Sequence, residues 1–175
     1  MSTTIVIPQE FPWVLLCIAV ICLECVVMGF AVVSPARRRL FTPEFMSQFK
    51  EEHEKAFPGQ SVPRGGYPDH GDGRYAMKLG YKQWVEFNNA IRVHQNFVEA
   101  LPMVVFMLFV GGIVLPKFAL ATGIINGTCR IIYATMYVKG GSDSRVIGAV
   151  AGSLPLYLLG IANFIELIIL AAGGY

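Results

Sequence analysis

Residues 97–137 read FVEALPMVVFMLFVGGIVLPKFALATGIINGTCRIIYATMY, and this stretch decides the fold. It holds two long apolar runs that are separated only by Leu115-Pro116-Lys117, which leaves room for a tight turn. A helix that crosses a bilayer needs about 20 mainly apolar residues, and each run supplies them. The stretch therefore predicts two transmembrane helices that are antiparallel neighbours.

Two more apolar runs flank this pair, so we predict an all-α integral membrane protein with a four-transmembrane-helix bundle. The predicted spans cover about residues 11–33, 84–115, 118–138 and 146–172 of a single domain, residues 1–175. A long polar loop, residues 34–83, begins with a charged, helix-like stretch from Pro43 to Lys55 and continues rich in glycine and proline. The composition agrees, because 15% of the residues are charged, against about 25% in soluble domains.

The basic residues predict the orientation of these spans. The first span lacks a basic segment before it and is followed at once by Arg37-Arg38-Arg39, which argues against a cleaved signal peptide. Most of the 14 Lys and Arg residues lie in the first and third loops. Under the positive-inside rule these loops face the cytosol, and both termini face the other side.

Composition and spacing exclude several classes of function. A net charge of +2 leaves no broad basic face, so we expect no nucleic-acid partner. Cys22 and Cys25 have CxxC spacing but lie, like Cys17 and Cys129, in an apolar run without the polar approach that redox chemistry needs. No cluster of His, Cys and carboxylates has ligand spacing, so we expect no metal site.

Polar residues follow one face of each helix in the central pair. On the second span the stripe is Asn88, Arg92, Gln95, Asn96 and Glu99, with His94 on the opposite flank. On the third span the stripe is Asn126, Arg130, Tyr133 and Tyr137. Steps of three and four residues place such side chains on one helical face. Both stripes point to the cytosolic leaflet, and Arg145 sits at the same end.

Two interpretations of the stripes stay open. They could be salt bridges and hydrogen bonds that lock the bundle, with Arg92 paired to Glu99. Alternatively, the surplus of arginine and tyrosine donors receives an anion with several acceptors, because arginine binds carboxylates with two parallel hydrogen bonds. Glu99 would then hold an ammonium group, and a small zwitterionic peptide with an extra carboxylate matches this set. For Glu24, in mid-span, we expect a packing role with a donor from another helix or subunit.

The run from Phe87 to Pro102, FNNAIRVHQNFVEALP, is similar to a known signature. It resembles the FNxxxRxHxNxxExxP motif of the membrane-associated proteins in eicosanoid and glutathione metabolism (MAPEG), and most of all microsomal glutathione transferases of type 3. The segment VSPARR at residues 33–38 and the pattern Arg130-x-x-Tyr133-x-x-x-Tyr137 are also similar to that family. The resemblance covers all four predicted spans, whereas the loop from about Pro43 to Gln83 is longer than usual.

The resemblance implies a homotrimer with glutathione, as a co-substrate, bound between neighbouring subunits and open to the cytosolic leaflet. The implied glutathione-binding residues are Arg38 from the neighbouring subunit, Arg92, His94, Asn96, Glu99, Arg130, Tyr133 and Tyr137. His94 occupies a position that is glutamine in some relatives. Arg145, with Tyr133, resembles the catalytic arginine that stabilises the glutathione thiolate, although its spacing from Tyr137 is one residue longer than in some members.

The implied activity is a membrane-bound glutathione transferase or peroxidase. It would join glutathione to lipophilic electrophiles, or reduce lipid hydroperoxides, that arrive laterally from the membrane lipids. No metal is expected. An alternative is a non-catalytic accessory subunit that binds other subunits of a larger membrane complex, and a third is a lipid-binding presenter. On the resemblance we expect the endoplasmic reticulum membrane, with a mitochondrial membrane as the alternative.

Overall fold

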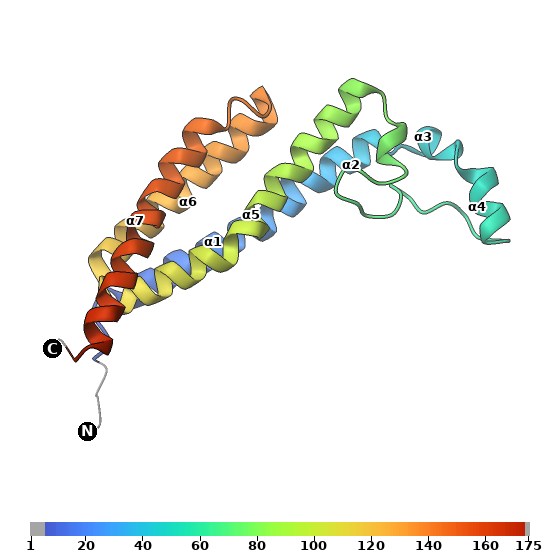
Figure 1. Cartoon of the computed structure of the whole chain (residues 1–175). Coiled ribbons are helices and arrows are strands. Elements are labelled where there is room, and N and C mark those ends of the chain that lie inside the picture. Colours follow the sequence, from blue (N-terminus) through green and yellow to red (C-terminus); the bar gives the residue numbers. More distant parts are fainter. Residues whose placement is uncertain (1–5, 174–175) are drawn as a thin grey trace. The chain divides into compact units, whose positions relative to one another are not determined.

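The computed structural model describes residues 6–173, and all regular secondary structure among them is helical (Figure 1). The elements in chain order are α1 (Phe11–Met28), a π-helical turn η1 (Gly29–Val33), α2 (Ser34–Leu40), α3 (Pro43–Ser47), α4 (Lys50–Ala56), a 3-10 turn η2 (Ala76–Lys78), α5 (Tyr81–Val114), α6 (Pro116–Gly140) and α7 (Val146–Ala171). The chain divides into two compact units, here called unit 1 (Met1–Val26 and Asn96–Tyr175) and unit 2 (Val27–Gln95).

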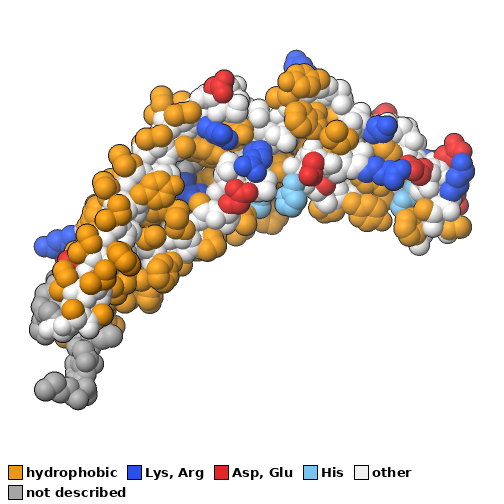
Figure 2. Space-filling view, viewed as in Figure 1, with side chains coloured by type: hydrophobic (Ala, Val, Ile, Leu, Met, Phe, Trp, Pro, Cys, Tyr) orange, Lys and Arg blue, Asp and Glu red, His pale blue; other side chains and the backbone are white. Residues whose placement is uncertain are grey.

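Among the described residues, three helical stretches are long and apolar enough to cross a membrane. They are Phe11–Leu40, Tyr81–Val114 and Val146–Ala171, which match the predicted first, second and fourth spans. The predicted third span forms α6, a helix of 25 residues, whose hydropathy is lowered by Asn126 and Arg130. Hydrophobic side chains cover most of the drawn face of unit 1 (Figure 2). That α6 is a fourth membrane span stays a prediction.

The predicted tight turn between the two central helices is confirmed. α5 ends at Val114 and α6 begins at Pro116, so Leu115 alone separates them. The Leu115 backbone N–H donates to the Gly111 carbonyl oxygen over 2.7 Å and caps the end of α5. Proline suits the first turn of α6, because no intrahelical partner exists there for the N–H that it lacks. The apolar core of unit 1 contains Val14, Ile21, Val104, Leu108, Ala119, Leu156 and Leu159.

Helices α6 and α7 run side by side (Figure 1) and touch through two buried glycines. A Cβ atom at Gly148 would lie 2.7 Å from the backbone nitrogen of Tyr133. One turn later, a Cβ atom at Gly152 would lie 3.0 Å from the Cβ atom of Cys129. Small residues four apart let helix backbones approach closely inside a membrane. The Gly148–Gly152 pair therefore sets the distance between the two helices.

Unit 2 shows what holds the long polar loop. The Arg37 guanidinium, on α2, donates to the Gly65 carbonyl oxygen over 2.7 Å and to the Tyr67 carbonyl oxygen over 3.1 Å. It also lies above the rings of Phe41 and Phe87, 5.0 and 5.1 Å from their centroids. The buried side chains of this unit are Ala36, Leu40, Phe41, Met46, Phe49, Ala76, Leu79, Phe87, Ala90 and Ile91. The loop is therefore packed onto α2 and the first half of α5.

Part of the long loop is helical. The predicted helix-like stretch from Pro43 to Lys55 is present but divided into α3 and α4. The Thr42 hydroxyl caps the start of α3 by accepting from the Phe45 backbone N–H over 3.2 Å. Farther on, the Trp84 indole N–H donates to the Gly71 carbonyl oxygen over 2.8 Å and ties the glycine-rich segment to α5.

We expect Gly148→Ala to destabilise the protein by about 1–3 kcal/mol, because the new methyl group meets backbone atoms that cannot rotate away. The measurement is the thermal unfolding of the detergent-solubilised protein. Gly160→Ala is the matched control on the same helix, since its Cβ atom would meet only the flexible end of Met107. Equal stability of the two variants would contradict the proposed close contact.

Candidate functional site

The turn between α6 and α7 places Arg145 at the start of α7. α6 ends at Gly140, and Gly141 has a φ of +76°, a left-handed conformation that glycine adopts without strain. The Ser144 hydroxyl oxygen lies 2.7 Å from the Met136 carbonyl oxygen and closes the turn onto the last part of α6. Arg145 follows directly and is thereby held at the end of the helix pair.

Arg145 reaches back to a tyrosine of α6. Its Nη1 atom donates to the Tyr137 hydroxyl oxygen over 3.2 Å. The guanidinium also lies 5.2 Å from the centroid of the Tyr137 ring. Tyr137 is 4% exposed, so this contact is shielded from surrounding solvent or lipid. The one-residue extension between Tyr137 and Arg145 thus does not prevent the two side chains from meeting.

A second tyrosine continues the same group of side chains toward α5. The Tyr133 and Tyr137 rings pack edge to face with centroids 5.6 Å apart. Tyr133 is 8% exposed, and its hydroxyl oxygen accepts a hydrogen bond from the Asn96 amide nitrogen. Four predicted site residues, Asn96, Tyr133, Tyr137 and Arg145, therefore form one connected group within unit 1. We call this set the tyrosine–arginine cluster.

The hydrogen bonding of the cluster decides what it can bind. Both tyrosine oxygens act as acceptors, one from Asn96 and the other from Arg145. Each phenol also carries one O–H donor. Among the described residues, no hydrogen bond from either hydroxyl hydrogen is present, and Arg145 interacts electrostatically with both tyrosines. Two O–H donors and a guanidinium together make a site that favours an anion.

Arg130 belongs to a neighbouring network on α6. Its Nε atom donates to the side-chain oxygen Oδ1 of Asn126 over 3.2 Å, and its guanidinium lies 4.6 Å from the centroid of the Phe97 ring. Asn126 in turn donates to the Gly152 carbonyl oxygen of α7 over 3.0 Å. Hydrogen bonds to described residues occupy only the Nε atom of Arg130. Its two terminal nitrogens retain donors for another group.

Glu24 adds a negative charge near Arg130 from α1. A Cβ atom at Gly127 would lie 3.4 Å from Glu24 Oε1, so the glycine leaves space beside the carboxylate. Glu24 and Arg130 interact electrostatically, although no direct ion pair joins them. The Glu24 Oε2 atom is buried and has no hydrogen-bond partner among the described residues. The expected partner for Glu24 is thus a charge on α6 of the same chain.

The other predicted site residues have different surroundings. Glu99 lies on an exposed face of α5 in unit 1. Arg38, Arg92 and His94 belong to unit 2. There the His94 Nε2 atom lies 3.4 Å from the position of a Cβ atom on Gly29, so the imidazole packs against the π-helical turn. The roles of these four residues in binding glutathione stay predictions.

Sequence reasoning missed two members of the Arg130 network, Asn126 and Phe97. Asn126 lies on the predicted polar stripe of the third span but had no predicted role in the site, and Phe97 gave no signal beyond its apolar character. For Glu24 the expectation was a packing role with a donor from another helix or subunit, and Arg130 lies on another helix. Asn126 could have been paired with Arg130 from the cost of leaving a charge alone in a membrane helix. No group of described His, Cys, Asp and Glu side chains is arranged to hold a metal ion.

A double-mutant cycle tests the coupling between Glu24 and Arg130. We expect Glu24→Gln and Arg130→Gln each to lower the free energy of unfolding of the detergent-solubilised protein. The loss in the double variant should be about 1–2 kcal/mol smaller than the sum of the two single losses. Removing one charge leaves the other buried without compensation, whereas removing both does not. The control cycle pairs Arg130→Gln with Glu166→Gln near the far end of α7, where we expect additive effects. Additivity in the first cycle would disprove the coupling.

Comparison with known protein families agrees with this architecture and site. The model of the MAPEG family matches residues 14–165, which include most of the three apolar spans, the loop and the tyrosine–arginine cluster. Such a match over most of the sequence, together with helices that can cross a membrane, establishes the class of protein. The chain is an integral membrane protein and belongs to the MAPEG family.

Proposed function

We propose that this chain is a membrane-bound glutathione transferase that also reduces lipid hydroperoxides, similar to microsomal glutathione transferases of type 3. Membership of the MAPEG family supports a glutathione-dependent activity of the transferase or eicosanoid-metabolism type. The observation that carries the proposal is the tyrosine–arginine cluster, in which Tyr133 and Tyr137 offer unused O–H donors beside Arg145.

The chemistry begins with the thiol of glutathione. A free cysteine thiol has a pKa of about 8.5, so only a few per cent is the reactive thiolate at neutral pH. A guanidinium and two hydroxyl donors around the sulfur favour the charged form and lower that pKa. We assign this role to Arg145 and Tyr133, with Tyr137 holding the Arg145 guanidinium in place. The released proton leaves to water on the cytosolic side.

The remaining predicted residues would hold the peptide. The terminal nitrogens of Arg130 suit a carboxylate of glutathione, since its Nε atom is already engaged by Asn126. Asn96 is well placed to contact the peptide because it lies next to Tyr133. We also assign Arg92, His94 and Glu99 to glutathione binding on the basis of their motif, with Glu99 opposite the ammonium group. No metal takes part in these contacts.

Two reactions follow from one thiolate. In conjugation, the sulfur forms a bond to an electrophilic carbon while a leaving group departs with its electron pair, or while a double bond accepts the electrons and then a proton. In peroxide reduction, the sulfur takes the terminal oxygen of the hydroperoxide, which leaves a lipid alcohol. A second glutathione then converts the sulfenic acid to a disulfide and water. Both substrates are apolar, so they would enter laterally from the bilayer.

Arg38 supports the proposed homotrimer with sites between subunits. In the run Arg37-Arg38-Arg39, the first arginine is bound to Gly65 and Tyr67 carbonyl oxygens, and the third is paired with Glu86. Arg38 is exposed, and no hydrogen bond or ion pair joins it to any described residue. A side chain held between two anchored neighbours is well suited to reach a site on a neighbouring subunit.

The runner-up is a non-catalytic accessory subunit of a larger membrane complex. The observation that favours it is unit 2, whose long loop is folded with its own core. In that role the chain would keep its fold without binding glutathione. We place the proposed enzyme in the endoplasmic reticulum membrane, with a mitochondrial membrane as the alternative that suits the accessory role.

We expect Arg145→Ala to lower kcat/KM for conjugation by about 100-fold, the usual effect of removing one donor that stabilises a developing charge. Glutathione should still bind, but the ultraviolet absorbance of its thiolate in the complex should disappear. Arg145→Lys should recover part of both signals. Lys139→Ala, an exposed cation at the end of α6, is the matched control and should behave as the parent protein. Absence of glutathione binding to the parent protein would favour the accessory subunit.

Mixed oligomers test whether Arg38 acts between subunits. Arg38→Ala and Arg145→Ala chains, each weakly active alone, should regain roughly a quarter of the parent activity when co-expressed in equal amounts, because random assembly leaves that share of intersubunit sites intact. Co-expression of Arg145→Ala with Tyr133→Phe should restore nothing, since both residues lie in one cluster of the same chain. Equal recovery in the two mixtures would contradict an intersubunit role for Arg38.

A further inference from the structure

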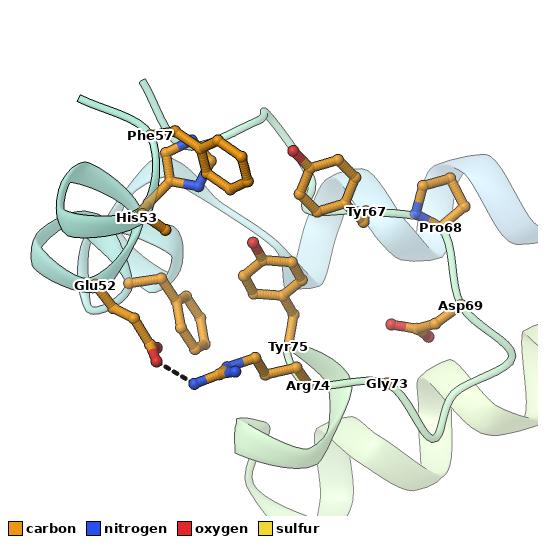
Figure 3. Close-up of a pocket in the computed structure, with 11 residues that line it drawn as sticks. Glu52, His53, Phe57, Tyr67, Pro68, Asp69, Gly73, Arg74 and Tyr75 are labelled. Atoms are coloured by element: carbon orange, nitrogen blue, oxygen red, sulfur yellow. Dashed lines mark hydrogen bonds and ion pairs between the residues drawn. The ribbon is translucent and has the colours of Figure 1, made fainter. Parts of the chain in front are cut away.

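A pocket of about 450 Å³ lies in unit 2 and shares no residue with the tyrosine–arginine cluster (Figure 3). It opens between α4 and the segment that leads from Tyr67 to Tyr75. The residues that line it are Phe49, Glu52, His53, Ala56, Phe57, Tyr67, Pro68, Asp69, Gly73, Arg74 and Tyr75. Its volume is within the range of about 300–1,000 Å³ typical of small-molecule sites. All lining residues lie between Phe49 and Tyr75 in the long loop, and none of them has a role in the proposed glutathione reaction.

The α4 wall of the pocket comes from a single helical face. Phe49 precedes α4, and Glu52, His53, Ala56 and Phe57 follow it at steps of three, one, three and one residues. Such spacing keeps side chains on one side of a helix. Four exposed charged residues lie on the opposite side of α4, namely Lys50, Glu51, Glu54 and Lys55. The helix is therefore amphipathic, and its apolar face is turned to the cavity.

Aromatic rings make up most of the wall. The Phe49 and Tyr75 rings pack edge to face at 4.7 Å, and the Tyr67 ring is stacked on Tyr75 at 6.3 Å. The rings of His53 and Phe57 lie 5.2 Å apart on the α4 side. Figure 3 shows the Tyr67 and Tyr75 hydroxyls directed toward that side. Several aromatic faces around one space attract cations, and methylated ammonium groups above all.

Charged side chains stand at two edges of this aromatic enclosure. Glu52 and Arg74 form an ion pair at one edge, while Asp69 stands at another, where it is paired with Arg37 over 3.8 Å and accepts from the Gly71 backbone N–H over 2.8 Å (Figure 3). Each carboxylate of the lining thus has a basic partner, and the preference for a cation comes from the aromatic rings. The Arg74 side chain is 70% exposed, so its guanidinium can also contact an anionic group at the mouth.

The Tyr75 hydroxyl stays neutral. Burial, with a smaller contribution from the nearby Tyr67 phenol, raises the pKa of Tyr75 above its ordinary value. Its O–H therefore remains a donor at neutral pH and does not add a phenolate charge to the pocket. The pocket thus combines aromatic faces with the two ion pairs Glu52–Arg74 and Asp69–Arg37.

We propose that the pocket between α4 and the Tyr67–Tyr75 segment binds a phosphocholine group, with its trimethylammonium among Phe49, Phe57 and Tyr67 and its phosphate on Arg74. The position of the loop in the chain supports this ligand class. The pocket residues follow shortly after the candidate span that ends at Leu40 and precede the one that begins at Tyr81. Both ends of the loop are therefore held at the membrane surface, where zwitterionic lipid head groups are abundant.

The full-length protein, produced in a host without choline lipids and solubilised in a maltoside detergent, tests the proposal. Saturation-transfer NMR on the trimethylammonium protons should show saturable binding of phosphocholine and weaker binding of choline. Tyr67→Leu should weaken both by roughly 5-fold, the usual effect of losing one aromatic contact to a cation. Arg74→Gln should weaken the binding of phosphocholine and leave the binding of choline unchanged. Tyr81→Leu, an exposed tyrosine outside the pocket, is the matched control.

Two further results decide the outcome. Tyr67 and Phe57 are 53% and 47% exposed, so Tyr67→Leu and Phe57→Leu should not unfold the chain. No saturable binding, or binding unchanged in both variants, would overturn the proposal, as would equal competition by inorganic phosphate. Displacement of phosphocholine by phosphatidylcholine in mixed micelles would assign the site to lipid head groups. Binding without such displacement would assign it to a soluble phosphocholine compound.

Discussion

The arrangement of unit 1 depends on one constraint, which is the cost of burying a polar group in an apolar helix without a partner. Asn126 has two partners, because its side-chain amide nitrogen donates to the Gly152 carbonyl oxygen of α7 and its side-chain oxygen Oδ1 accepts from Arg130. An unsatisfied polar group in hydrocarbon costs several kcal/mol. This residue therefore fixes the contact between α6 and α7, the rotation of Arg130 and, through the helix pair, the position of Arg145.

The same constraint separates the two arginines of the site into different roles. Arg130 interacts electrostatically with Glu24 and is held by a hydrogen bond to Asn126. Neighbouring groups of the protein therefore offset part of its charge. Arg145 donates to the Tyr137 hydroxyl and lies against its ring, and no ion pair joins it to a carboxylate among the described residues. Its positive charge therefore stays at the end of α6 and α7, next to two O–H donors. This environment supports the proposal that Arg145 stabilises a thiolate.

Unit 2 applies a similar principle outside the spans. Arg37 binds two loop carbonyl oxygens and covers two aromatic rings, so a segment rich in glycine and proline folds on α2. Glycine and proline content is typical of a flexible loop, because composition counts turn residues and gives no information on contacts with an arginine that is distant in sequence. The folded loop forms a pocket whose aromatic and charged lining differs from the residues of the tyrosine–arginine cluster.

The amino-acid sequence was enough to predict the apolar helices, the tight turn at Leu115 and the two polar stripes that carry Asn96 and the pair Tyr133 and Tyr137. Periodicity and hydropathy are local properties, and a helix imposes them whatever surrounds it. The folded chain was needed to show that Arg145 meets Tyr137 across a longer turn, that Glu24 lies near Arg130, and that the loop forms a pocket. These contacts join residues from different elements, so no local pattern predicts them.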